Sequence, residues 1–95
     1  MTYEIKCDEL RRMVECDGVL IDVRSNYEFS QGALKHAVNV PIESIPYYAE
    51  QIDRNKPVML YCLSGARADM VKRFLESIGF DNVHNLGGIR QLAQG

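Results

Sequence analysis

One stretch decides the fold expected of this chain: Val58-Met59-Leu60-Tyr61-Cys62-Leu63-Ser64-Gly65-Ala66-Arg67. Its first half is a nearly continuous apolar run, which is typical of a strand that is covered on both faces. A short loop with a central glycine follows, and Arg67 then opens a helical pattern with one apolar stripe. A buried strand that passes through a short loop into a helix is the repeating unit of an α/β fold.

The alternation of strand and helix patterns continues on both sides of this stretch. Apolar runs at 3–5, 19–23, 38–40 and 83–86 join 58–62 as strand candidates, and helical patterns occupy 8–16, 44–52 and 67–78. Strands that alternate with helices predict a parallel sheet wrapped by helices on both faces. We therefore expect an α/β fold of three layers, with a central, mostly parallel sheet of about five strands.

Cys62 is the residue of this pattern that can carry chemistry. In parallel α/β folds, ligands bind at the carboxyl ends of the strands, and Cys62 is expected at one of them. A cysteine thiol, whose ordinary pKa is about 8.5, becomes more acidic at a helix N-terminus or beside a cation. Gly65 would let the loop amides turn toward the sulfur, and Arg67 would add a positive charge. The pattern predicts a reactive thiolate at Cys62, and not the buried core cysteine that is more common in proteins.

The loop and several segments around it resemble the rhodanese family. Cys62, Gly65 and Arg67 match the active-site pattern Cys-x-x-Gly-x-Arg of that family in register. Further similarity lies at residues 21–24, 27–29, 32–41 and 86–89, so it extends over nearly the whole chain. The resemblance implies a single rhodanese-like domain over residues 1–95, with the three-layer fold of that family.

The resemblance also implies the activity of a rhodanese-type, thiosulfate sulfurtransferase-like enzyme. In the family, a cysteine thiolate takes a sulfane sulfur from thiosulfate, a polysulfide or a persulfide and holds it as a persulfide. A thiol or cyanide then removes that sulfur. In this chain Cys62 is the implied nucleophile, and the loop of Leu63, Ser64, Gly65, Ala66 and Arg67 is implied to stabilise the anionic persulfide. The residues implied to support the loop are Asp22, Arg24 and Glu28.

Several of these residues also have a simpler structural interpretation. Arg67 could tie the loop to the sheet instead of favouring the thiolate or orienting an anionic donor. The Ser64 hydroxyl could reach the sulfur or cap the next helix. Asp22 and Arg24 could hold the loop, with Asp22 accepting hydrogen bonds from its N–H groups. Alternatively, they could form an ordinary surface ion pair worth about 0–1 kcal/mol.

Some positions depart from the usual family pattern. Leu63 is apolar where many members have a polar or charged residue, which removes an anion contact. This change favours an apolar or protein-borne persulfide over free thiosulfate as the donor. Ala33 and His36 stand where a histidine and a glycine are usual, and we expect them to alter the rim of the active site. The tryptophan that often follows Gly-Gly is absent, and Leu92 is expected to pack in its place.

Two other functions fit parts of the pattern. Phosphatase and arsenate reductase enzymes use a similar cysteine and arginine, but they typically have one residue more between them than the four of this chain. The tighter loop suits a single sulfur atom better than a tetrahedral oxyanion. A non-catalytic rhodanese-like binding module would commonly lack the cysteine, which this chain keeps. The sequence therefore favours sulfurtransferase activity.

Size, charge and cysteine content limit the possible partners. The chain has 95 residues and a net charge of −2 with no basic block, so nucleic acid and an anionic membrane are poor candidates. Three cysteines without paired spacing fit a reducing compartment, and no apolar signal segment is visible. A cytoplasmic location is therefore expected. The expected partners are a small sulfur donor and a thiol acceptor, with a protein-borne persulfide as an alternative, and a monomer is plausible.

The remaining candidate ligands and thiols predict no further chemistry. His36 and His84 lack metal-ligand spacing with the cysteines, so neither a metal nor another cofactor is expected. Cys7 and Cys16 lie in or beside the first helical pattern, away from any strand-to-helix loop. We expect them to be packing or surface residues and not resolving thiols.

Overall fold

A four-stranded parallel sheet forms the centre of the computed structural model, which describes residues 1–16 and 18–94. The strand order is β4 (Val38–Asn39), β2 (Val19–Asp22), β5 (Val58–Cys62) and β6 (Val83–Gly88). β1 (Thr2–Tyr3) and β3 (Ala33–Leu34) form a separate parallel pair. The expected α/β fold is confirmed, but the strand predicted at 3–5 starts earlier, is shorter and pairs with β3 outside the main sheet.

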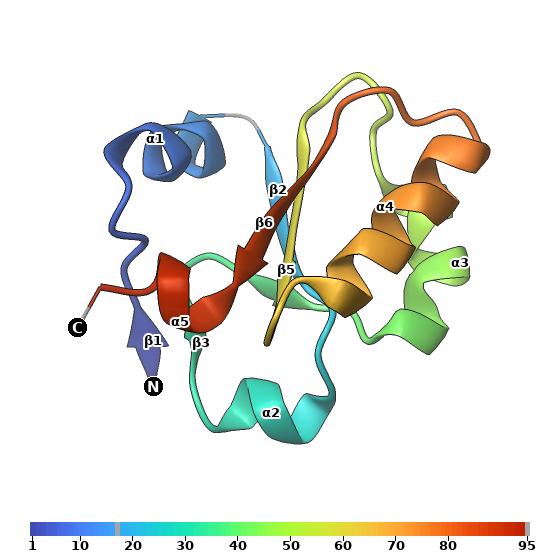
Figure 1. Ribbon diagram of the computed structural model, residues 1–95. Helices are drawn as coiled ribbons and strands as arrows, with labels where there is room; N and C mark the ends of the chain where they lie inside the picture. Colours follow the sequence, from blue (N-terminus) through green and yellow to red (C-terminus); the bar gives the residue numbers. More distant parts are fainter. Residues whose placement is uncertain (17, 95) are drawn as a thin grey trace.

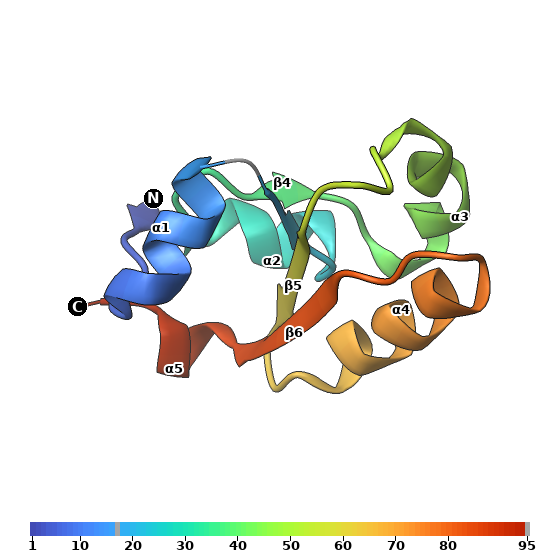
Figure 2. The same ribbon diagram turned by 90° about the horizontal axis from the view of Figure 1, so that it is seen from above.

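Helices cover both faces of this sheet, as the sequence predicted (Figures 1 and 2). One face packs against α3 (Ile45–Tyr48) and α4 (Ala66–Ser77), and the other packs against α1 (Asp8–Cys16) and α5 (Ile89–Leu92). α2 (Asn26–Ser30) lies beyond the carboxyl ends of the strands, below the sheet in Figure 1. The layers leave the carboxyl ends of β2, β5 and β6 facing α2, which is where Cys62 ends its strand.

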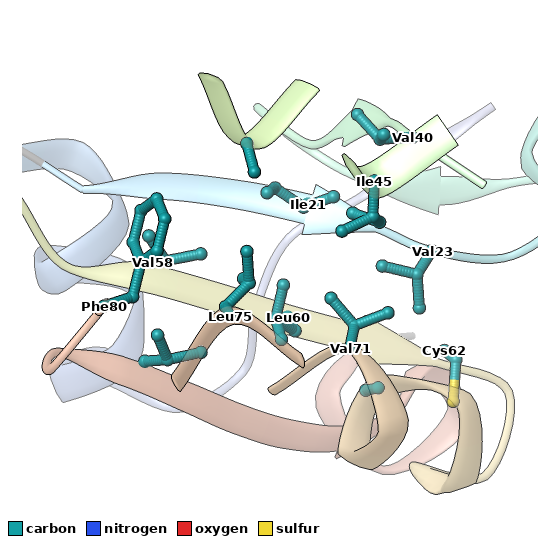
Figure 3. Packing of buried hydrophobic residues seen from close by; sticks show 13 residues of the cluster. Ile21, Val23, Val40, Ile45, Val58, Leu60, Cys62, Val71, Leu75 and Phe80 are labelled. Atoms are coloured by element: carbon teal, nitrogen blue, oxygen red, sulfur yellow. The ribbon is translucent and has the colours of Figure 1, made fainter. Parts of the chain in front are cut away.

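Each face of the sheet has its own hydrophobic core, and β5 contributes side chains to both. This explains the unbroken apolar sequence of β5. All of its side chains are fully buried. Leu60 and Cys62 pack in one core with Val71 and other residues of α4 (Figure 3), whereas Tyr61 packs in the other core. Successive side chains of a strand point to opposite faces, so a strand between two helical layers has no position for a polar side chain that reaches water. Figure 3 shows Cys62 at one end of its row of buried side chains.

The two long helices lie where the sequence predicts them, whereas the short helical segments differ from the prediction. The predicted helix at 8–16 coincides with α1, and the one at 67–78 is shifted by one residue in α4. The predicted helix at 44–52 is divided into the 3-10 turn η1 (Ile42–Ser44), α3 and the 3-10 turn η2 (Ala49–Gln51). Pro46, in the first turn of α3, cannot donate a backbone hydrogen bond. Among the described residues, 1–16 and 18–94, no helix is both long enough and apolar enough to cross a bilayer.

Candidate active site

The sulfur of Cys62 lies inside the turn that connects β5 to α4. The Gly65 N–H donates a hydrogen bond to Cys62 Sγ at 2.9 Å, and both groups are buried. Gly65 precedes the first residue of α4 and has a φ of 96°, in the left-handed region that glycine adopts without strain. This conformation turns the amide back toward the strand, so a backbone donor at the start of a helix faces the sulfur. Such a donor stabilises a negative charge on the sulfur.

The end of β6 supports the back of this turn. Cys62 is paired with Gly88 in the sheet register. A Cβ atom at Gly88 would lie only 2.4 Å from the Leu63 carbonyl oxygen, so the loop rests directly on the glycine backbone. The Asn85 side chain donates to the Gly65 carbonyl at 3.0 Å and accepts from the Gly87 N–H at 2.9 Å. Sequence reasoning missed Asn85, and the local signal for it is a half-buried amide side chain inside a strand.

A two-point ion pair connects the start of α4 to α2. The Arg67 guanidinium donates to the two Glu28 carboxylate oxygens at 2.7 and 3.0 Å. Glu28 is itself fixed by a capping box, in which it accepts the Ser25 N–H at 3.0 Å and donates its own N–H to the Ser25 hydroxyl at 3.1 Å. Arg67 therefore ties the loop to α2, and not to the sheet, which was the structural alternative considered from the sequence. Glu28 is a direct partner of the loop.

This ion pair shapes the charge around the cysteine. Hydrogen bonding to Arg67 lowers the pKa of Glu28 to about 2, against the opposing effect of burial. Hydrogen bonding to Glu28 in turn raises the pKa of Arg67, and the charges of Glu28 and Cys62 add to that effect. Arg67 thus interacts favourably with a negative charge on the sulfur while its own charge is largely balanced by Glu28. The contact with Glu28 is what the structure shows for Arg67, and a role in favouring an anion at Cys62 stays a prediction.

Replacing Glu28 by Gln should weaken the protein in a pH-dependent way. The Glu28 carboxyl has a pKa of about 2 in the folded chain and an ordinary value of 4.5. Its contribution to stability is therefore present above about pH 4.5 and is lost as the pH falls toward 2. Glu28→Gln should lower the free energy of unfolding at neutral pH by about 1 kcal/mol. The melting temperature should then fall by about 4–8 °C.

The control for this experiment is Glu76→Gln, which removes an exposed ion pair with Lys72 on α4. Its effect should be small at every pH, because exposed pairs of this kind contribute little. The measurement is thermal unfolding of the three proteins between neutral pH and about pH 2.5. A Glu28→Gln difference that stays constant over that range would show that the ion pair does not stabilise the fold.

Asp22 and Arg24 form a buried pair and not a surface ion pair. Their exposed fractions are 0% and 5%, and the Arg24 guanidinium donates to both Asp22 carboxylate oxygens and to the Gly32 carbonyl. The Arg24 N–H also donates to the Asp22 carboxylate, at 2.9 Å. Within the described residues, the Asp22 carboxylate accepts none of the expected hydrogen bonds from N–H groups of the cysteine loop. The pair instead fixes the connection from β2 to α2, from which Glu28 reaches Arg67.

Ser64 and Leu63 occupy the solvent side of the loop. The Ser64 hydroxyl accepts the N–H of Ala66 at 3.4 Å, a weak bond, and the N-cap position of α4 is taken by Gly65. Leu63 has 46% of its surface exposed, so its apolar side chain forms part of the entrance to the loop. Ala66, which the sequence assigned to the loop, is the first residue of α4.

The other singled-out residues lie away from Cys62. Cys7 and Cys16 are exposed at the two ends of the α1 region, and Cys16 is close to the amino end of β2. The prediction that His36 shapes the rim is wrong, whereas Ala33 directly follows Gly32, which lines the cavity beside Leu63. Ala33 is buried in β3, and His36 lines a cavity with residues of α1 and the start of β2, at the opposite end of the sheet. Leu92 is buried in the α5 core, so its predicted packing is confirmed.

These features define a class of protein: a parallel α/β domain with a cysteine at the carboxyl end of a central strand and a helix N-terminus facing its sulfur. The chain belongs to the rhodanese-like domain family, whose model matches residues 6–94. The resemblance carried by the loop and its neighbouring segments is therefore confirmed.

A curated relative and two solved structures agree with this family. A tRNA uridine(34) hydroxylase of Pectobacterium carotovorum is 32% identical to this chain over 98 residues, which cover 95% of the chain but 28% of that relative. The chain thus spans little more than a quarter of that longer protein. A rhodanese with anions from E. coli has a TM-score of 0.76 and 29% identity, covering 82% of this chain and 94% of that one. A rhodanese-like domain protein from Staphylococcus aureus has a TM-score of 0.78 and 26% identity, covering 99% and 93%.

Proposed function

We propose that this chain is a sulfurtransferase that carries a sulfane sulfur as a persulfide on Cys62. The observation that supports the proposal best is the 2.9 Å hydrogen bond from the Gly65 N–H to Cys62 Sγ. A backbone donor held by a helix N-terminus favours an anionic sulfur in the resting thiolate. After sulfur transfer, N–H groups of the same loop would stabilise the additional, terminal sulfur.

The proposed reaction has two displacement steps at sulfur. In the first, the Cys62 thiolate attacks the sulfane sulfur of the donor, and a new S–S bond forms. The bond between that sulfur and the rest of the donor breaks, and its electron pair leaves with sulfite when the donor is thiosulfate, or with a thiolate when the donor is an organic persulfide. In the second, an acceptor thiolate attacks the terminal sulfur, and the electron pair of the broken bond returns to Cys62 as a thiolate. Neither step requires an external oxidant or reductant.

The phosphatase alternative receives no support from the loop. Four residues separate Cys62 from Arg67, and among the described residues the Gly65 amide alone donates a hydrogen bond to the sulfur. Arg67 already donates to both Glu28 carboxylate oxygens, so a phosphate oxyanion would compete with Glu28 for the guanidinium. For the relatives that modify tRNA, the whole-protein activity involves a much longer chain, so we propose for this chain only the chemistry of the cysteine loop.

The proposed partners are a small sulfur donor and a thiol acceptor, which can also be a persulfide carried by another protein. All three cysteines are free, as a reducing compartment such as the cytoplasm would keep them. A resting thiol is required for the first step, because only the reduced cysteine can attack the donor.

Intact-mass spectrometry tests the proposal directly. The reduced protein is incubated separately with thiosulfate, with inorganic polysulfide and with an organic persulfide, and is then desalted. We expect a gain of one sulfur atom with at least one donor, and its loss on adding a thiol acceptor. If no donor adds sulfur and the protein hydrolyses a phosphate monoester with normal enzymatic efficiency, the proposal is wrong and the phosphatase class is correct.

A further inference from the structure

A cavity of about 390 Å³ opens beside the cysteine loop, between α2, α5 and β1. Its walls include Leu63 of the loop, Glu28 of α2, and Ile89 and Arg90 of α5. Tyr3 adds an aromatic ring from β1. The cavity therefore adjoins the proposed site through two of that site's own residues, Leu63 and Glu28. In Figure 1, α2 and α5 flank the lower, carboxyl end of β5.

The contact between β6 and the loop fixes how close α5 lies to the cysteine. Gly88 is in register with Cys62 and lies against the Leu63 carbonyl. α5 begins at the next residue, Ile89, whose side chain is buried in the core, and Arg90 follows on the exposed side. α5 thus adds a guanidinium group to the cavity that Leu63 also lines.

Arg90 is the charged residue in the cavity wall that has no ion-pair partner among the described residues. The other guanidinium in the wall, that of Arg24, is paired with the buried carboxylate of Asp22. The carboxylate in the wall, that of Glu28, is paired with Arg67. Arg90 forms no ion pair with any residue in 1–16 or 18–94, so the cavity has a net positive charge on one side and apolar surface from Leu63, Ile89 and Tyr3 on the others.

We infer that this cavity binds the organic part of the acceptor thiol, with an aliphatic chain against Leu63 and Ile89 and a carboxylate at Arg90. The inference rests on the proposed sulfurtransferase function and names its substrate class: a low-molecular-weight thiol that carries a carboxylate. Many family members have a polar or charged residue where this chain has Leu63, and Arg90 of α5 would bind the anion in its place. An acceptor with both an apolar body and a negative charge fits these walls better than a purely inorganic anion does.

The cavity positions the acceptor for the second displacement step. The acceptor thiolate attacks the terminal sulfur of the Cys62 persulfide, and an S–S bond forms between acceptor and sulfur. The bond from that sulfur to Cys62 Sγ breaks and its electron pair stays on Sγ as a thiolate, while the terminal sulfur leaves on the acceptor as the acceptor's persulfide. Arg90 takes no part in the bond changes; it orients the acceptor through its carboxylate.

The test uses a matched series of acceptors with protein that has been loaded with sulfur by polysulfide. The acceptors are mercaptoacetate, mercaptopropionate and mercaptohexanoate, each compared with its neutral amide at equal thiolate concentration. For the wild type we expect the carboxylate to have a higher kcat/KM than its amide for at least one chain length, by about three- to fivefold at low salt. Arg90→Ala should bring that ratio close to one, and Arg90→Lys should restore part of it. High salt should reduce the wild-type ratio, since Arg90 is exposed.

Arg12→Ala is the matched control, because it removes an equally exposed arginine on α1 that does not line this cavity. It should keep the wild-type ratio. The inference is overturned if the wild type shows no carboxylate preference at any chain length, or if Arg90→Ala and Arg12→Ala change the ratio equally. A protein that loads no sulfur at all contradicts the proposed function instead, and that result is seen in the mass spectrum before any acceptor is added.

Discussion

Cys62→Ser should abolish sulfur transfer while leaving the fold intact. Serine is close to cysteine in shape, and its oxygen can still accept the hydrogen bond that the Gly65 N–H donates to the sulfur. The serine hydroxyl is not ionised at neutral pH, so it is a poor nucleophile, and it cannot hold a sulfane sulfur as a persulfide. We therefore expect kcat/KM to fall by roughly three orders of magnitude or more, as for the loss of other nucleophiles. The mass spectrum should show no added sulfur, and circular dichroism should be unchanged.

Cys7→Ser and Cys16→Ser are the controls for that result. Both cysteines are exposed, and Cys16 lies near the amino end of β2, at the other end of the sheet from Cys62. Each variant should keep most of the wild-type activity and gain the same mass with a donor. If sulfur transfer persists in Cys62→Ser, or disappears in one of the control variants, then a thiol other than Cys62 carries the sulfur.

The position of Cys62 could be predicted because its determinants are local in sequence. Helices cover both faces of β5, so its side chains are all buried and its sequence is an unbroken apolar run. The apolar residues of α4 recur with helical spacing and start within a few residues of that run. Strand, turn and helix thus follow from consecutive residues. The short elements α2, β3 and α5 have too few residues for a periodic pattern, so the sequence did not predict them.

Glu28 was implied only by the family resemblance, and the contacts of the loop could not be predicted from spacing because they are tertiary. Glu28 and Arg67 are 39 residues apart, and Asn85 and Gly65 are 20 apart. No spacing rule relates residues at such distances within a parallel sheet. The error at His36 has the same origin: the chain turns away from the site after β3, so that His36 lies beside α1 and the start of β2. Arg90 was missed because its position depends on α5, a helix of four residues.

Gly88→Ala should disable the loop without unfolding the domain. The backbone of Gly88 has φ −100° and ψ 146°, values that alanine adopts without strain. The new Cβ would, however, lie 2.4 Å from the Leu63 carbonyl oxygen, 3.2 Å from the Leu63 carbonyl carbon and 3.4 Å from the Ser64 Cα. All three atoms belong to the backbone, so the loop itself must move. A displacement of about 1 Å at a reacting group can cost on the order of 100-fold in rate, and we expect sulfur loading to slow by 10- to 100-fold on that scale.

Gly87→Ala separates this effect from a simple loss of stability. Gly87 has a φ of 102°, so alanine there is strained by roughly 1 kcal/mol or more, yet the nearest atom to its Cβ is the Gln91 side-chain oxygen at 3.6 Å. This variant should have a lower melting temperature but load sulfur at a rate much closer to that of the wild type. The measurement is the time course of mass gain at a temperature where both variants are fully folded. Equal loading rates in Gly88→Ala and the wild type would show that the loop does not need β6 to hold Gly65 against the sulfur. Equal losses in both variants would attribute the effect to stability, whereas slow loading in Gly88→Ala alone requires that the position of the Leu63 backbone determines how the sulfur is held.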